Sequence, residues 1–168
     1  AGKTTLFNCL SRLYIPDSGE ILFQGESIMN LPTHRMAPLG IGRTFQNLAL
    51  FRTMTVMENV MVGAHCRSRS DFLSDALGLP WVRQRETVLR QHAWELIVYL
   101  GLEEHTHVPV SDLSFGTQKR VEIARALAAE PELLLLDEPA GGLNHEEVEE
   151  LKELIWRIRS DFNVTVLL

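Results

Sequence analysis

The sequence predicts an α/β fold with a mostly parallel sheet and a phosphate-binding loop, and three features indicate it. Residues 1–5, AGKTT, match the second half of the phosphate-loop pattern G-x-x-x-x-G-K-[ST]. The apolar run 133–136 is typical of a buried parallel strand and ends on two carboxylates, Asp137 and Glu138. Between these features, residues 47–112 carry helical patterns instead of strands. We therefore expect an α/β core interrupted by a helical insertion.

Length and composition set broad limits. A chain of 168 residues, 45% of them apolar, can bury one core, with or without a subdomain. The formal net charge of −6 argues against nucleic acid as a partner. Cys9 and Cys66 are too few for a disulfide framework, which is typical of a reducing cytosol. No apolar run approaches the roughly 20 residues that span a bilayer. We expect an excised fragment, because the chain starts inside a motif and without methionine.

The first quarter of the chain alternates helices and strands. The apolar residues Leu6, Phe7, Leu10 and Leu13 predict a helix directly after the loop, which the turn at 16–19 stops. The elements expected next are short strands at 20–24 and 27–28, a short helix over 32–38, and a strand over 41–45 that ends at Gln46.

The rest of the chain, after residue 46, predicts helices before and after the apolar strand at 133–136. Helices are expected over 56–64, 81–100 and 145–162, and from the turn at 114–116 onward. The longest should bury one face made of Val88, Leu89, Ala93, Leu96, Ile97 and Leu100. Asn144 is the expected N-cap of the last helix, with Glu147 at the capping-box position, and 164–168 predicts a second buried strand.

The first five residues carry the chemistry of a phosphate site. The backbone N–H groups of the loop, from Ala1 through Gly2 to Thr5, are donors for phosphate oxygens, and Lys3 neutralises the β- and γ-phosphates. The hydroxyl of Thr4 suits Mg²⁺, which takes few protein oxygens beside phosphate oxygens and waters. These residues therefore predict binding of a magnesium nucleotide.

Polar residues at strand ends complete that site. Asp137 can hold the same Mg²⁺ through water, and Glu138 is the candidate to orient or deprotonate an attacking water. Gln46 can reach the metal or the water with its amide. The turn of Ser114 and Gly116 opens a helix whose dipole and free N–H groups can face an anion. Taken by itself, the acid pair is as compatible with helix capping as with catalysis. The order of all these features along the chain therefore distinguishes the two functions.

That order resembles the nucleotide-binding subunits of ATP-binding cassette (ABC) transporters over the entire chain. The letters LSFGTQ at 113–118 resemble the family's signature motif, LLLLDEP at 133–139 its Walker B strand, and GGLN at 141–144 its D-loop. The resemblance implies a P-loop NTPase core of residues 1–46 and 113–168 and an inserted helical subdomain of residues 47–112. In this family two subunits pack head to tail, which implies that Ser114 and Gly116 bind the partner's γ-phosphate in trans.

Residues 42–60, GRTFQNLALFRTMTVMENV, are similar to the Q-loop region of the ATP-binding proteins of branched-chain amino acid importers. This similarity implies ATP hydrolysis with Mg²⁺, a second ATPase subunit, and membrane permease subunits served by a solute-binding protein. It also implies a peripheral position on the cytoplasmic face of the membrane. The alternatives are an ABC ATPase for another solute or for lipid or polysaccharide export, and a soluble ABC ATPase without a permease. The absence of sustained heptads in 47–112 disfavours the soluble alternative.

Some positions depart from the family pattern or leave two readings open. Thr117 replaces the usual Gln of the signature motif. The aromatic Phe115 matches the branched-chain amino acid group, which usually has an aromatic residue at this position. The adenine-stacking aromatic and the switch histidine of the family would lie outside the chain. Met54, Met57 and Met61 fall at helical spacing after the Q-loop. They either pack in the core, which we favour, or line a groove for a permease helix.

Overall fold

A computed structural model of the chain describes residues 2–45, 48–66 and 80–168. The helices and strands follow in the order α1 (Lys3–Leu10), β1 (Leu22–Phe23), β2 (Glu26–Ser27), α2 (Met36–Leu39), β3 (Ile41–Arg43), α3 (Val56–His65), α5 (Pro80–Tyr99), α6 (Phe115–Leu127), β4 (Leu133–Leu135), α7 (His145–Asp161) and β5 (Thr165–Leu167). Three 3₁₀ turns accompany them: η1 (Thr33–Arg35), η2 (Glu103–His105) and η3 (Val110–Asp112). The predicted alternation of helices and strands is confirmed.

The centre of the molecule is a parallel three-stranded sheet in the order β3-β4-β5. Leu134 of β4 pairs with Gly42 of β3 on one side and with Val166 of β5 on the other. Successive side chains of a strand point to opposite faces, and β4 is buried on both. Leu134 and Leu136 enter one hydrophobic cluster, whereas Leu135 enters another. The apolar run therefore forms the buried middle strand that the sequence predicts.

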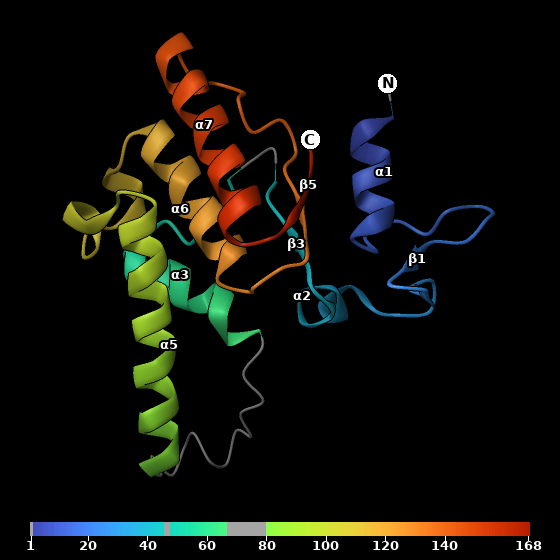
Figure 1. The fold of residues 1–168 in the computed structure, drawn as a ribbon, viewed down its shortest axis with the longest axis horizontal. Helices are drawn as coiled ribbons and strands as arrows, with labels where there is room; N and C mark the ends of the chain where they lie inside the picture. Colours follow the sequence, from blue (N-terminus) through green and yellow to red (C-terminus); the bar gives the residue numbers. More distant parts are fainter. Residues whose placement is uncertain (1, 46–47, 67–79) are drawn as a thin grey trace.

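Helix α1 covers one face of this sheet (Figure 1). Phe7, 2% exposed, packs there with Ile28, Met36, Ile41 and Leu135. The antiparallel pair β1 and β2 follows α1 in the chain and forms a separate small sheet. Because Phe7 is the buried residue of α1, the helix is fixed to the sheet through one aromatic ring.

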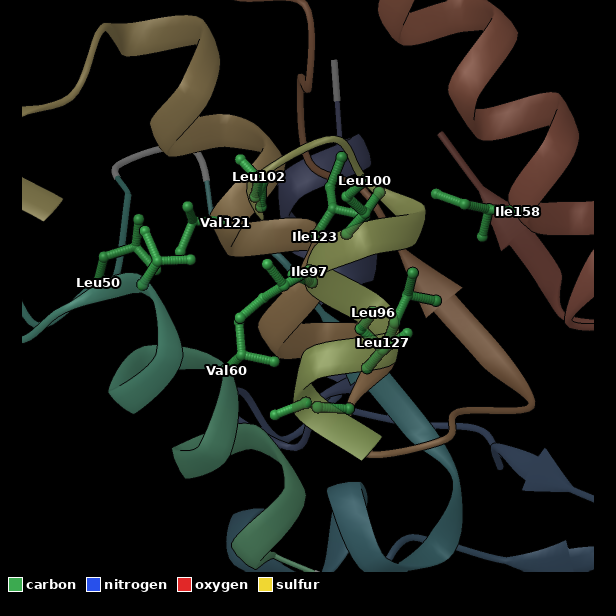
Figure 2. Close-up of a cluster of buried hydrophobic side chains, with 14 of the residues drawn as sticks. Leu50, Val60, Leu96, Ile97, Leu100, Leu102, Val121, Ile123, Leu127 and Ile158 are labelled. Atoms are coloured by element: carbon green, nitrogen blue, oxygen red, sulfur yellow. The ribbon is translucent and has the colours of Figure 1, made fainter. Parts of the chain in front are cut away.

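The other face of the sheet carries the helical layer, with α3, α5, α6 and α7 (Figure 1). Figure 2 shows its core, in which aliphatic side chains of α3, α5 and α6 interdigitate. Val60 of α3, Ile97 of α5 and Val121 of α6 are each completely buried. One contiguous cluster therefore extends from the helices of the 47–112 segment through α6 to α7 and β4.

Two predictions about helices were wrong in part. Helix α1 ends at Leu10, so Leu13 lies outside it and is 46% exposed. The helix stops because Ser11 donates its hydroxyl to the carbonyl of Phe7 and Arg12 adopts a left-handed backbone conformation (φ 58°). On α5, Val88 is 63% exposed, whereas Ala93, Leu96, Ile97 and Leu100 are buried as predicted. The buried face of α5 thus begins near Leu89, where α5 reaches the main cluster.

Candidate functional site

The first turn of α1 presents the residues of the predicted phosphate loop. Gly2 is the N-cap of the helix in a left-handed conformation (φ 101°), and a Cβ at this position would meet nothing within 4 Å. Glycine is the residue that adopts this conformation without steric cost. Lys3, Thr4 and Thr5 follow in the first turn and are all exposed. The free N–H groups of this turn and the helix dipole are therefore open to an anion. Ala1 lies outside the described residues.

Asp137 lies two residues beyond the end of β4 and is 4% exposed. Its Oδ2 accepts a hydrogen bond from Nη2 of Arg43 at 3.1 Å, and this ion pair is almost completely buried. Arg43 is the last residue of β3, and in the parallel pairing it stands opposite Leu135. The guanidinium of Arg43 offsets the cost of burying this carboxylate. The structure thus places a carboxylate just beyond the carboxyl end of the central strand, where ligands bind in open α/β sheets.

Glu138 starts the turn that follows, and its backbone is in the left-handed region (φ 47°). The carbonyl of Glu138 accepts the N–H of Gly141 at 3.0 Å, which closes the turn, and the residue is exposed. A left-handed conformation at a non-glycine residue is uncommon, although Arg12, Gln24, Glu130 and Asn163 of this chain share it. The turn therefore carries Glu138 out of the line of the strand, whereas Asp137 remains in it.

A helix, α6, begins at the turn of residues 114–116, as the sequence predicts. Ser114 is the N-cap, and its Oγ accepts the N–H of Thr117 at 3.2 Å. The hydroxyl of Thr117 lies 2.8 Å from the same Oγ, so this unusual signature residue reinforces the cap. Helices α1 and α6 lie on opposite faces of the sheet (Figure 1). Within one chain, the two predicted anion sites are therefore separate.

Close approaches join the signature turn to the turn after β4 and to the first turn of α7. A Cβ on Gly142 would lie 2.8 Å from Cε1 of Phe115, and Gly142 has a φ of 83°. A Cβ on Gly116 would lie 2.6 Å from Oε1 of Glu147. Glu147 also accepts the N–H of Asn144 at 2.9 Å, which completes the predicted capping box of α7. Glycine is thus required at Gly142 by conformation, whereas a side chain at Gly116 would displace the carboxylate of Glu147 from the cap.

A buried acid on α6 holds the end of β3. Glu122 is 2% exposed, and its Oε1 accepts the N–H of Phe45 at 3.0 Å. Burial raises the pKa of Glu122, and the backbone hydrogen bonds from Phe45 and Ala49, with the charge of Lys119, oppose that rise. Nζ of Lys119 lies 4.0 Å from Oε2 of Glu122, and both side chains are buried. Gln46 follows Phe45 but lies outside the described residues, so its predicted role remains a prediction.

Sequence reasoning missed Arg43, Glu122 and the Phe115–Gly142 contact. Arg43 carried a usable signal, a charged residue at the end of an otherwise apolar strand, whereas Glu122 did not, because Lys119 and Arg125 lie beside it on the helix. The contact of Phe115 with Gly142 had none, because it joins two turns that are distant in sequence.

The comparisons with known proteins now define the class. The family model described as "ABC transporter" matches residues 1–141, so the chain belongs to the ABC transporter family. Solved cassettes have the same fold: the ADP conformation of MJ1267, "an ATP-binding cassette of an ABC transporter", superposes with a TM-score of 0.80 at 28% identity, covering 99% of this chain and 64% of that one. A dimeric post-hydrolysis state of the cassette MJ0796 bound to ADP and Pi gives 0.77 at 27% identity, covering 98% and 68%. The predicted P-loop NTPase fold is confirmed.

Within the ABC transporter family, the chain is similar to two proteins of branched-chain amino acid transport. The chain is 44% identical over all 168 residues to the "High-affinity branched-chain amino acid transport ATP-binding protein BraF" of Pseudomonas aeruginosa. It is 43% identical over the same length to the corresponding protein LivG of Escherichia coli (strain K12). The chain spans 66% of the length of each of these relatives. The resemblance to this group is therefore confirmed over the whole chain.

Proposed function

We propose that the chain is the catalytic part of an ATP-hydrolysing subunit that powers an importer of branched-chain amino acids. The observation that carries the proposal is the buried Asp137 and adjoining Glu138 at the carboxyl end of β4, in a chain whose full length matches two transport ATP-binding proteins. We propose the division into a core (1–46 and 113–168) and a helical subdomain (47–112) on the same basis.

The first turn of α1 would hold the phosphates of ATP. The backbone N–H groups from Ala1 to Thr5, including that of Gly2, would donate to the α- and β-phosphate oxygens, and Lys3 would neutralise charge on the β- and γ-phosphates. The exposure of Lys3, Thr4 and Thr5 supports this role, because a ligand can reach them without rearrangement.

The described residues also fit Mg²⁺. A hydroxyl on Thr4 and a carboxylate on Asp137 are the hard oxygen donors that this ion takes alongside phosphate oxygens and waters. Gln46 would add an amide oxygen to the set. Bound Mg²⁺ would offset negative charge on the transferred phosphoryl group. Asp137 would hold a carboxylate oxygen in a fixed position at the strand end.

Glu138 is the candidate general base. Its exposed carboxylate would accept a hydrogen bond from the attacking water and draw off its proton, with Gln46 helping to orient that water. The left-handed turn supports this assignment, because it separates the side chain from the buried Asp137.

The second half of the site would come from another subunit. Since α1 and α6 lie on opposite faces of the sheet, Ser114 and Gly116 would serve a nucleotide held by Lys3 of a second chain, packed head to tail as the resemblance to the family implies. We propose such a dimer, in which the capped N-terminus of α6 binds the γ-phosphate held by the partner. Homo- and heterodimers both satisfy this arrangement.

The remaining partners are those of an importer. In the part of the chain that the structure describes, no helix is long and apolar enough to cross a bilayer. By its similarity to transport ATP-binding proteins, the chain would work at the cytoplasmic face of the membrane, bound to permease subunits that receive solute from a separate binding protein. Residues 47–61 are the proposed docking surface, since Phe51 is 48% exposed and Met54 36%. Met57 and Met61 are buried, so for these two the core-packing reading is confirmed.

Uptake in cells tests the proposal. In a strain that lacks this subunit, the intact protein should restore uptake of radiolabelled leucine, and Lys3→Ala should not, although it is made in equal amount. Restored uptake of an unrelated solute instead would support another ABC importer. ATP hydrolysis without restored uptake of any solute would support a soluble ABC ATPase and overturn the transport role.

A further inference from the structure

Arg43 is the one side chain that contacts the proposed metal ligand Asp137 through a recorded ion pair in the described residues. Side chains two residues apart on a strand share a face, so Asp137 continues the side of β4 on which Leu135 packs against α1. Arg43 stands opposite Leu135 in the register and reaches that same side. The pair therefore lies between the sheet and α1, the helix that begins with the proposed phosphate loop.

Arg43 is held in place by more than Asp137. Its Nη1 donates to Oγ of Ser11 at 3.0 Å, while the hydroxyl of Ser11 donates a hydrogen bond to the carbonyl of Phe7 at 2.7 Å. The guanidinium also lies 4.9 Å from the ring centroid of Phe45 and 6.0 Å from that of Phe7. The side chain is 7% exposed, so it has no open path into solvent.

These contacts indicate that the side chain of Arg43 stays in place when a metal ion binds and is not displaced by it. A cation that merely filled the metal position would have to leave when Mg²⁺ arrived, and Arg43 would then lose Ser11 and both rings. A planar guanidinium with each Nη on a different partner instead constrains the orientation of the carboxylate it binds. Among the residues that the structure describes, the bond from Arg43 reaches Oδ2 of Asp137 and not Oδ1, so Oδ1 can face another ligand.

We propose that Arg43 is a positioning residue for Mg²⁺: it binds Oδ2 of Asp137 and thereby sets Oδ1 toward the metal. The inference rests on the proposed function, since it takes Asp137 as the metal ligand. Partners of metal-ligating carboxylates typically change metal affinity by about 10- to 100-fold when removed. Arg43 belongs to this class of residue, although it touches neither the nucleotide nor the metal.

The test measures metal binding apart from turnover. With the intact protein, binding of the fluorescent nucleotide mant-ADP is titrated with MgCl₂, and the Mg²⁺ concentration for half-maximal enhancement is compared among variants. Arg43→Ala should raise that concentration about 10-fold and leave mant-ADP affinity in EDTA within about twofold. Arg43→Lys keeps the charge but cannot bridge Asp137 and Ser11, so it should fall between. Leu154→Ala, a cavity in the helical cluster, controls for general destabilisation and should leave the Mg²⁺ dependence unchanged.

A double-mutant cycle separates this inference from the proposed function. If Arg43 acts through Asp137, adding Arg43→Ala to Asp137→Asn should raise the half-saturating Mg²⁺ concentration no further. An unchanged or lower half-saturating concentration in Arg43→Ala would overturn the positioning role, the lower value marking Arg43 as a competing cation. No shift in Asp137→Asn would instead remove Asp137 as a metal ligand. Should Arg43→Ala not fold, the Arg43→Lys titration decides, and a wild-type value there refutes the inference.

Discussion

Replacing Glu138 by glutamine tests the proposed hydrolytic step at a single carboxylate. Glutamine keeps the length and shape of the side chain and has the same unbranched Cβ, so the left-handed backbone at this position (φ 47°) is equally accessible to it. Because Glu138 is exposed, we expect the free energy of unfolding to change by no more than about 0.5 kcal/mol. The substitution therefore removes basicity and charge with little effect on the fold.

The expected loss of rate follows from the proposed role. Removing a general base typically slows the chemical step about 10²- to 10⁴-fold, which corresponds to roughly 3–5 kcal/mol of barrier. Nucleotide affinity should remain within a few-fold of the wild type, because Lys3, Thr4 and the buried Asp137 are untouched. Phosphate release by the intact protein gives the rate, and mant-ATP binding gives the affinity. Turnover within tenfold of the wild type would show that Glu138 is not the base.

Trapped ATP should then hold two subunits together, since a ligand that binds only the dimer shifts assembly by mass action. Glu138→Gln should elute from size exclusion as a dimer with Mg²⁺ and ATP and as a monomer without them. Ser114→Arg places a large cation at the exposed N-cap of α6 and should abolish the dimer without weakening ATP binding to the monomer. If the dimer persists in the double variant, the nucleotide site is not shared between subunits.

Four further substitutions test packing, charge and docking. Gly63→Ala on α3 would place a Cβ 2.0 Å from the carbonyl oxygen of Arg125, so thermal or urea unfolding should show a loss of about 1–3 kcal/mol or more. Burial raises the pKa of Glu122 above 4.5, so its contribution to stability is fully present below that pH and is lost as the pH rises through the raised value. Relative to Glu122→Gln, the wild type should therefore gain stability as the pH falls from 7 toward 4.5; a constant difference in unfolding free energy would contradict this. Met54→Glu should uncouple uptake from basal ATP hydrolysis, whereas Met57→Glu in the core should lose folding and hydrolysis together; equal loss in both variants would argue against docking at Met54.

The parts of the fold that the sequence predicted are those governed by local rules. The capping box of Asn144 and Glu147 predicted the first residue of α7 correctly, and the four leucines from residue 133 predicted β4. Both predictions depend only on residues that are close together in the sequence. The end of α1 was misjudged because Leu13 continues the apolar spacing. There a local hydrogen bond of Ser11 and the left-handed Arg12 override periodicity.

The site was predictable in its residue types and unpredictable in its internal supports. The positions of Lys3, Asp137 and Glu138 follow from motif order, and the structure puts them at a helix start and a strand end. The support of Asp137 by Arg43 depends on the register between β3 and β4, which fixes which residues stand side by side across 94 positions of sequence. No pattern within a single strand encodes that register.

The division of β4 between the two hydrophobic clusters also determines how the molecule can come apart. Leu135 is completely buried on the α1 side, and Leu134 and Leu136 are completely buried on the helical side. Unfolding of α1 or of the helical layer alone would expose one face of β4 to solvent and so destabilise the layer on the other face. We therefore expect the two layers to unfold as one cooperative unit. Amide hydrogens of residues 134–136 should accordingly exchange with solvent only through global unfolding. Their exchange rates would serve as an internal gauge of total stability, whichever layer a substitution disturbs.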